Sequence, residues 1–348
     1  MIDREKVTRA IINLFKVNLC LGEDEKVLIL SDAPTPNEWR TLHPDFLASM
    51  VKRVMLARVV SDVAKEAFRT SKVETWIYPS VGGHGRDLPD DVAAKMLASN
   101  VVVGITTYSL THTTATKKAT EAGARVISMP SVEPEMFYPG GAIDADYKAI
   151  AADTLKMFEH LVKTDVVHIR SDDGTDLSFS IKSRRCWAET GILSKDSAMK
   201  VGNLPAGEAS VAPVEGTAEG VIVVKANWYP RLDTDMILLV DKGVVNDVQG
   251  GGSVGEELRD FLKPQEQQQP YILRRNIAEL GIGTNPNAKR TDNVLEAEKI
   301  KGTVHIGIGS NFFLGGSVKT DFHTDFVVPK PDVLFDDKLI IRKGTWLI

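Results

Sequence analysis

The residues with the clearest chemical potential lie between positions 302 and 328. This stretch holds two of the seven histidines, His305 and His323, and it places Asp325 two residues after the second. Residues two apart in an extended strand point to the same face. His323 and Asp325 would therefore present an imidazole and a carboxylate side by side, and both are ligands that transition metals accept. The spacing predicts a metal site.

Two isolated glutamates extend this pattern. Glu208 follows a Pro–Ala–Gly turn in NLPAGEASVAP, and Glu279 lies between apolar neighbours in IAELGIGTNPNA, a predicted strand that enters a turn. A carboxylate in such surroundings is costly to bury unless it is paired or bound to a metal. For Glu208, a turn residue that accepts backbone hydrogen bonds is the alternative interpretation.

Together these positions supply three carboxylates and two imidazoles. Such a set suits a pair of divalent ions about 3.5–4 Å apart that share one ligand. Two divalent ions and three carboxylates leave a net charge of about +1, which favours a bridging hydroxide at neutral pH that could attack a polarised carbonyl. Zn, Co, Mn and Fe all accept nitrogen and oxygen ligands, so the set does not distinguish them.

The first half of the chain alternates short apolar runs with helical patterns. This alternation predicts an N-terminal α/β domain with a mostly parallel sheet. Strands are predicted at 26–32, 74–80, 101–107 and 124–130, and helices at 46–68, 92–100, 111–124 and 146–164.

From about residue 165 the chain becomes rich in strand patterns separated by turn signals, with one predicted helix at 255–263. A strand-rich α+β domain that carries the metal site is therefore predicted for the second half. The predicted domains are 1–165 and 166–348.

Composition narrows the possible partners. The net charge of −5 gives no support to a nucleic-acid partner, and no apolar run approaches the roughly 18 residues of a membrane span. The N-terminus lacks the apolar core of a signal peptide. Two cysteines, Cys20 and Cys186, fit a reducing cytoplasmic compartment. We expect a small molecule, a peptide or a second copy of the chain as partner.

Four ordered blocks of the sequence resemble the M29 metallo-aminopeptidases. They are NLPAGEASVAPVEGTAEG, NIAELGIGTNPNA, GTVHIGIGSNFFLGG and DFHTDFVV, and THTTATKKATEAGARVISMPSV matches the first domain more weakly. The resemblance implies a homodimer and a metal-dependent hydrolase. It also implies that Glu208 is shared between two metals, that Glu279 is the leading candidate for general base, and that His305, His323 and Asp325 complete the ligand set.

One position departs from that family. The peptidases carry a catalytic tyrosine seven residues after the equivalent of His305, where this chain has Phe312. Phenylalanine has no hydroxyl group to stabilise an oxyanion. The N-terminal residue of a peptide remains the expected substrate, with a small amide, or deamination at another C–N bond, as the rival.

A second related group, the iron-dependent 2,5-dihydroxypyridine dioxygenases, shares the scaffold. Its members hold one iron with two histidines and an aspartate, and they have a histidine where this chain has Glu279 and no histidine at the position of His305. The sequence therefore favours hydrolysis, with a ring-cleaving dioxygenase as the alternative. A binding protein with a vestigial site is the third hypothesis.

Overall fold

A computed structural model describes residues 2–348 and divides the chain into two compact units. Unit 1 contains the residues up to Ala149 together with Gly191–Ala206, and unit 2 contains Ile150–Thr190 and Gly207–Ile348. The predicted boundary after residue 165 differs from this division, because most of helix α6 (Tyr147–Leu161) belongs to unit 2 and a later segment returns to unit 1. That segment returns because it adds a strand to the sheet of unit 1.

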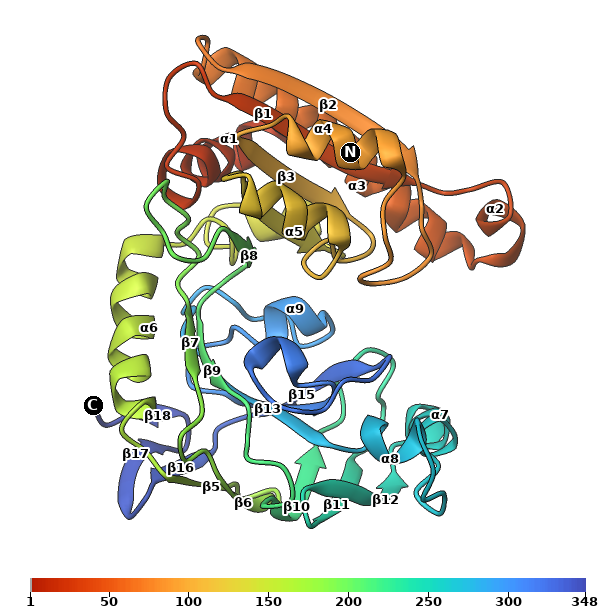
Figure 1. Cartoon of the computed structure of the whole chain (residues 1–348), viewed down its shortest axis with the longest axis vertical. Coiled ribbons are helices and arrows are strands. Elements are labelled where there is room, and N and C mark those ends of the chain that lie inside the picture. The colour runs from red at the N-terminus through yellow and green to blue at the C-terminus, as the bar shows by residue number, and fades with distance from the viewer. Residues whose placement is uncertain (1) are drawn as a thin grey trace. The chain divides into compact units, whose positions relative to one another are not determined.

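Unit 1 is built on a five-stranded sheet whose pairings are all parallel (Figure 1). Its strand order is β2-β1-β3-β4-β8. Strands β3 and β4 are buried along their whole length, which is typical of strands covered on both faces. The strands are β1 (Lys26–Ala33), β2 (Lys72–Pro79), β3 (Val101–Thr106), β4 (Arg125–Pro130) and β8 (Val201–Asn203).

Helices separate the parallel strands of unit 1, as the sequence predicts. They are α1 (Arg4–Asn13), which continues as a π-helical turn (Leu14–Asn18), then α2 (Glu38–Thr41), α3 (Pro44–Ala67), α4 (Asp90–Leu97), α5 (Thr114–Glu121) and a 3-10 turn (Pro134–Phe137). The hydroxyl of Thr113 caps α5 by accepting a hydrogen bond from the backbone N–H of Thr116.

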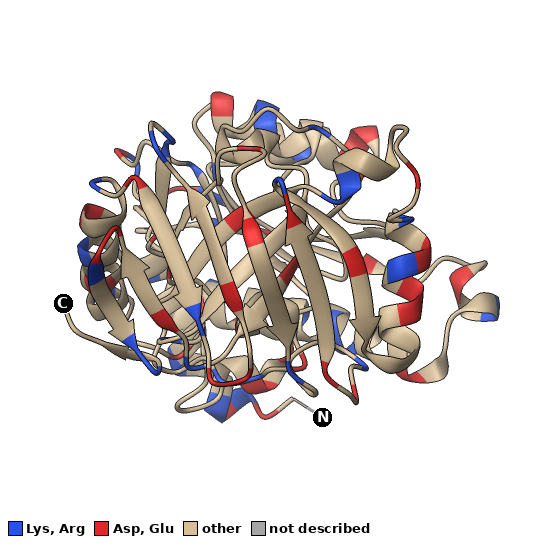
Figure 2. Cartoon of the chain, turned by 90° about the horizontal axis from the view of Figure 1, so that it is seen from below, with Lys and Arg blue, Asp and Glu red and all other residues tan. Residues whose placement is uncertain are grey.

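Unit 2 contains an eight-stranded antiparallel sheet in the order β12-β11-β10-β6-β5-β16-β17-β18. Buried residues alternate with more exposed ones along β5 and β6, so one face of the sheet enters the core. Figure 2 shows Asp and Glu interspersed with Lys and Arg along the strands that face the viewer. The strands are β5 (Val166–Arg170), β6 (Asp176–Ser180), β10 (Glu219–Val224), β11 (Met236–Asp241), β12 (Val244–Gly250), β16 (Asp332–Phe335), β17 (Lys338–Arg342) and β18 (Thr345–Trp346).

A second antiparallel sheet of unit 2 has the order β15-β14-β13-β9-β7. Its strands are β7 (Cys186–Glu189), β9 (Glu208–Val211), β13 (Ile277–Gly283), β14 (Val304–Gly309) and β15 (His323–Val328). The helices of unit 2 are α6 (Tyr147–Leu161), α7 (Gly252–Leu262), α8 (Tyr271–Arg274), α9 (Val294–Ala297) and a 3-10 turn (Phe312–Leu314).

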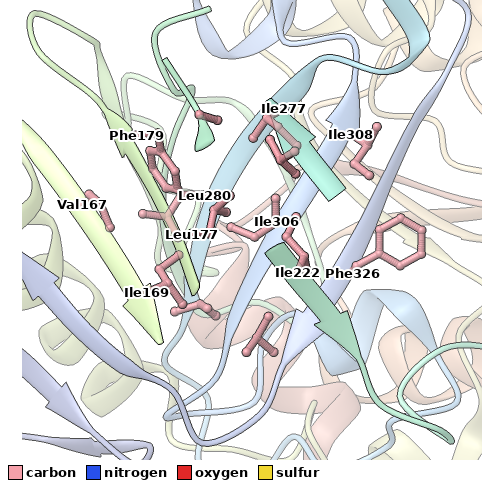
Figure 3. Close-up of a cluster of buried hydrophobic side chains, with 14 of the residues drawn as sticks. Val167, Ile169, Leu177, Phe179, Ile222, Ile277, Leu280, Ile306, Ile308 and Phe326 are labelled. Atoms are coloured by element: carbon pink, nitrogen blue, oxygen red, sulfur yellow. The ribbon is translucent and has the colours of Figure 1, made fainter. Parts of the chain in front are cut away.

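The two sheets of unit 2 share one hydrophobic core (Figure 3). Leu280 and Ile306 from the five-stranded sheet belong to the same buried cluster as Leu177, Phe179 and Ile222 from the eight-stranded sheet. Burial of these side chains fixes the register of β13 and β14, because a slip by one residue would turn every side chain to the opposite face.

The predicted fold class is confirmed: a parallel α/β region precedes strand-rich antiparallel sheets. The sequence-based prediction omitted the short strands β7, β8, β9 and β16. Glu208 consequently proves to be the first residue of β9 instead of a turn residue. Within residues 2–348, no helix combines the length and the apolar character needed to cross a membrane.

Candidate metal centre

One face of the five-stranded sheet of unit 2 carries all five residues that the sequence predicts as metal ligands. Side chains alternate between faces along a strand, and even-numbered residues of β13 and β14 such as Leu280 and Ile306 enter the core. Beyond the register shift between Ile277 and Glu279, odd-numbered residues of β13, β14 and β15 therefore point to the other face, where Glu208 joins them by pairing with Gly283. The residues gathered there are Glu208, Glu279, His305, His323 and Asp325.

Glycines stand opposite these side chains on the neighbouring strands. Gly281 pairs with His305, and Gly307 pairs with both Glu279 and Asp325. A Cβ atom added at Gly307 would lie 2.8 Å from Asp325 Oδ1 and 2.8 Å from Glu279 Cβ, and one at Gly281 would collide with the His305 ring. The glycines therefore provide the space in which the polar side chains converge.

Glu279, His323 and Asp325 form the first potential ligand set, the Glu279 group, whose ligand atoms all lie within 4.8 Å of one another. His323 Nε2 lies 3.3 Å from Glu279 Oε2 and 3.3 Å from Asp325 Oδ1. The other ring nitrogen, Nδ1, lies 2.8 Å from the carbonyl oxygen of Ser310. Donation of the Nδ1 proton to this carbonyl orients the ring and leaves Nε2 to face the carboxylates.

The electrostatics of the Glu279 group favour a cation between its members. Burial alone would lower the pKa of His323, but Asp325 and Glu279 outweigh it and raise that pKa well above the usual value. Burial would raise the pKa of Asp325, yet the attraction of His323 outweighs it and lowers that pKa. A positive charge at His323 Nε2 is therefore strongly stabilised in this protein.

Glu208, Glu298 and His305 form a second set, the Glu208 group, which also brings three ligand atoms within 4.8 Å. His305 Nε2 lies 3.6 Å from Glu208 Oε2 and 4.0 Å from Glu279 Oε1. The imidazole of His305 thus connects the two groups, and its Nδ1 atom is buried without a hydrogen-bond partner.

Sequence reasoning missed three members of this cluster: Glu189, Glu298 and Lys299. Lys299 Nζ lies 2.5 Å from Glu208 Oε2, 3.2 Å from Glu189 Oε2 and 3.3 Å from Glu298 Oε2. Burial opposes the charged form of Lys299, but the three carboxylates outweigh it and raise its pKa well above the usual value. Burial raises the pKa of Glu298. Glu298 and Lys299 lie in the charged run EAEK, a pattern typical of a solvent-exposed helix, and no sequence pattern distinguished Glu189.

Phe312 and Phe313 lie in the 3-10 turn between β14 and β15. Phe312, at the position of the peptidases' tyrosine, is 60% exposed. The ring of Phe313 meets the ring of His323 edge to face, with 5.0 Å between the centroids. An aromatic side chain therefore adjoins the Glu279 group, where it could contact a planar substrate.

The donors present fit a divalent transition metal. The Glu279 group offers one imidazole and two carboxylates, a set that Fe, Mn, Co and Zn accept. Asp325 Oδ1 is buried without a hydrogen bond, and the absence of a side chain at Gly307 leaves space beside it. The Ser310 carbonyl supplies the second-layer contact to His323 that metal-bound histidines usually have.

Comparison with known proteins identifies the family. The sequence profile of NicX, 2,5-dihydroxypyridine 5,6-dioxygenase, matches residues 10–347. The chain belongs to the NicX family. This match spans both units and includes every residue of the Glu279 and Glu208 groups. Among functionally curated proteins, none matches the chain.

Solved structures show that the NicX-family chain shares its scaffold with two kinds of enzyme. The 2,5-dihydroxypyridine dioxygenase from Pseudomonas putida KT2440 superposes with a TM-score of 0.72 at 18% identity, over 100% of this chain and 98% of the other. AmpT from Thermus thermophilus, an M29 aminopeptidase, superposes with a TM-score of 0.64 at 15% identity, over 99% of both chains.

NicX membership gives more support to the dioxygenase family than to the M29 peptidase family, the reverse of what the sequence suggested. The M29 resemblance holds for the scaffold, whereas the family is that of the dioxygenase. The chain is an enzyme of a metal-dependent family, and the metallohydrolase class expected from the sequence has weaker support than the dioxygenase class.

Proposed function

We propose that this protein is a ring-cleaving dioxygenase that acts on a dihydroxylated aromatic ring such as a dihydroxypyridine. The match of the NicX family over residues 10–347 carries this proposal. The metal would be a single ferrous ion held by Glu279, His323 and Asp325. That ion would supply the one-electron chemistry that allows oxygen to react with an aromatic ring.

The protein's own residues have separate tasks in this proposal. Glu279 and Asp325 provide the negative charge that retains a divalent cation, and the Ser310 carbonyl keeps His323 Nε2 directed at them. His305 Nε2, beside both ligand groups, is placed to accept a proton from a ring hydroxyl. Phe313 would contact the face or edge of the substrate ring.

Oxygen consumption tests the proposal. The protein is depleted of metal, loaded with Fe²⁺ without oxygen, and offered 2,5-dihydroxypyridine and other dihydroxylated rings in an oxygen electrode. We expect uptake of one O₂ per ring consumed and loss of the aromatic absorbance. Protein loaded with Zn²⁺ is the control and should consume none. Absence of uptake on every ring tested, in protein shown to hold iron, would refute the proposal.

A metal-dependent hydrolase is the second candidate, and one observation favours it. The two ligand groups adjoin, with His305 Nε2 between Glu208 and Glu279, so the five residues expected to bind two metals do lie together. This hydrolase would cleave an amide or another C–N bond, with Glu208 or Glu279 as proton shuttle. Release of amine from an aminoacyl, small-amide or aminated-ring substrate by Zn-, Co- or Mn-loaded protein would support it.

A further inference from the structure

Lys299 is the one lysine in the described chain that lies among the core's largest fully buried side chains. Its side chain is 2% exposed, and its ammonium lies against the carboxylates of Glu189, Glu208 and Glu298. Two of these carboxylates belong to the Glu208 group. The ammonium therefore occupies the carboxylate-rich side of that group.

Lys299 contacts Glu208 through Oε2, the carboxylate oxygen that a metal at the Glu208 group would bind. Oε2 of Glu208 lies 2.5 Å from Lys299 Nζ and also faces His305 Nε2 at 3.6 Å. Metal–ligand bonds of about 2.0–2.2 Å to both atoms would fit that separation. A divalent ion bound there would compete with the ammonium for Oε2 and would experience its positive charge at short range.

The backbone around Lys299 keeps the ammonium in place. Lys299 follows the single-turn helix α9 and Glu298, and its carbonyl accepts a 2.8 Å hydrogen bond from the N–H of Asn285. The N–H of Lys301 in turn donates to the carbonyl of Asn285 at 3.1 Å. This pair of bonds ties the segment to the end of β13, the strand that carries Glu279.

We propose that Lys299 is a built-in cation that takes the place of a second metal at the Glu208 group and limits the centre to one divalent ion at the Glu279 group. The inference rests on the proposed function only in locating the metal centre. Removal of the ammonium should convert a one-ion centre into a two-ion centre, with Glu208, Glu298 and His305 as ligands of the second ion.

Binding of Mn²⁺ to the full-length protein tests this proposal without any enzymatic assay. Equilibrium dialysis gives the number of ions, and electron paramagnetic resonance distinguishes an isolated ion from a coupled pair. We expect one isolated Mn²⁺ per wild-type chain and two coupled ions in Lys299→Met, with the second binding at least about 100-fold more tightly than in the wild type. Lys299→Arg, which keeps the charge, should bind one ion.

Lys301→Met is the matched control, because Lys301 also pairs with a carboxylate, that of Asp153, but lies at the surface edge of the same segment. It should bind one ion. The double variant Lys299→Met/Glu208→Gln should return to one ion, which would place the second ion at the Glu208 group.

Two coupled ions in the wild-type chain would overturn the proposal, and this measurement requires no variant to fold. A single ion in folded Lys299→Met would also overturn it. Failure of the dioxygenase proposal is distinguishable, because a chain that binds one ion but consumes no oxygen refutes the reaction and leaves the role of Lys299 standing.

Discussion

The imidazole of His323 is constrained at both nitrogens. Its Nδ1 atom faces the Ser310 carbonyl, and its Nε2 atom faces Glu279 and Asp325. The ring thus has one orientation in which it can serve a cation. Such a fixed orientation of the imidazole would favour metal binding at the Glu279 group.

Glu279 and Glu208 should differ in their effect on metal binding. If the ion binds at the Glu279 group, Glu279→Gln should weaken Mn²⁺ binding by at least about 100-fold, whereas Glu208→Gln should change it by less than about 10-fold. Titration of the metal-depleted protein measures both, with the surface variant Glu219→Gln as control. Equal losses in the two glutamate variants would favour the two-metal hydrolase.

Gly307→Ala should disturb the Glu279 group while leaving the sheet folded. The new Cβ would press on Asp325 Oδ1 and Glu279 Cβ at 2.8 Å, so we expect Mn²⁺ affinity to fall by about 10–100-fold. Gly281→Ala is the matched control, because its Cβ would displace His305 instead. Circular dichroism checks the fold. Unchanged affinity in Gly307→Ala would contradict the arrangement of this group.

At the scale of elements, the site depends on three strands that the sequence pattern predicts and on two short strands, β7 and β9, that it does not predict. The patterns around Glu279, His305 and His323 predict strands with polar residues on one face, and the structure has them. The pairing of β13 with β9 joins segments about 70 residues apart, and such a long-range register has no local sequence signature. Lys299 follows a single-turn helix, and its burial depends on carboxylates from β7 and β9.

The turn that carries Phe312 and Phe313 is tied down by Glu215. The Glu215 carboxylate accepts hydrogen bonds from Ser317 N at 2.7 Å and Asn311 Nδ2 at 2.8 Å, and it pairs with Arg184. Burial would raise the pKa of Glu215, but the hydrogen bonds from Ser317 and Asn311, the Ser317 bond foremost, outweigh it and lower the pKa to about 2.

A lowered folded-state pKa has a definite consequence for stability. The stabilisation from Glu215 is fully present above the unfolded-state pKa of about 4.5 and is lost as the pH falls towards about 2. Urea unfolding of the wild type and of Glu215→Gln should therefore show a difference in free energy of unfolding that is constant above about pH 5 and shrinks below it. A difference that stays constant down to pH 2 would contradict the assignment.

At the scale of the whole molecule, every member of both ligand groups belongs to unit 2. Metal binding should therefore stabilise that unit preferentially. At a free Mn²⁺ concentration of about 100 times the Kd, the expected gain is about 2.7 kcal/mol. Hydrogen exchange measured by mass spectrometry should show slowed exchange in β13, β14 and β15, with β1, β3 and β4 as internal control. Equal slowing of exchange in the parallel sheet of unit 1 and in the sheet that contains β13, β14 and β15 would contradict a metal centre confined to unit 2.

Residues 191–206 belong to unit 1 although they follow part of unit 2 in the sequence, and this affects the order in which the sheets can form during synthesis. Strand β8 joins the edge of the parallel sheet beside β4, although about 70 residues separate the two strands. At a synthesis rate of roughly 5–20 residues per second, β8 is synthesised several seconds after β4, and until then that edge of β4 has no partner strand. The candidate metal ligands His323 and Asp325 are synthesised later still, because they follow β8 by about 120 residues. The chain can therefore complete the parallel sheet of unit 1 before the candidate ligand groups of unit 2 can form.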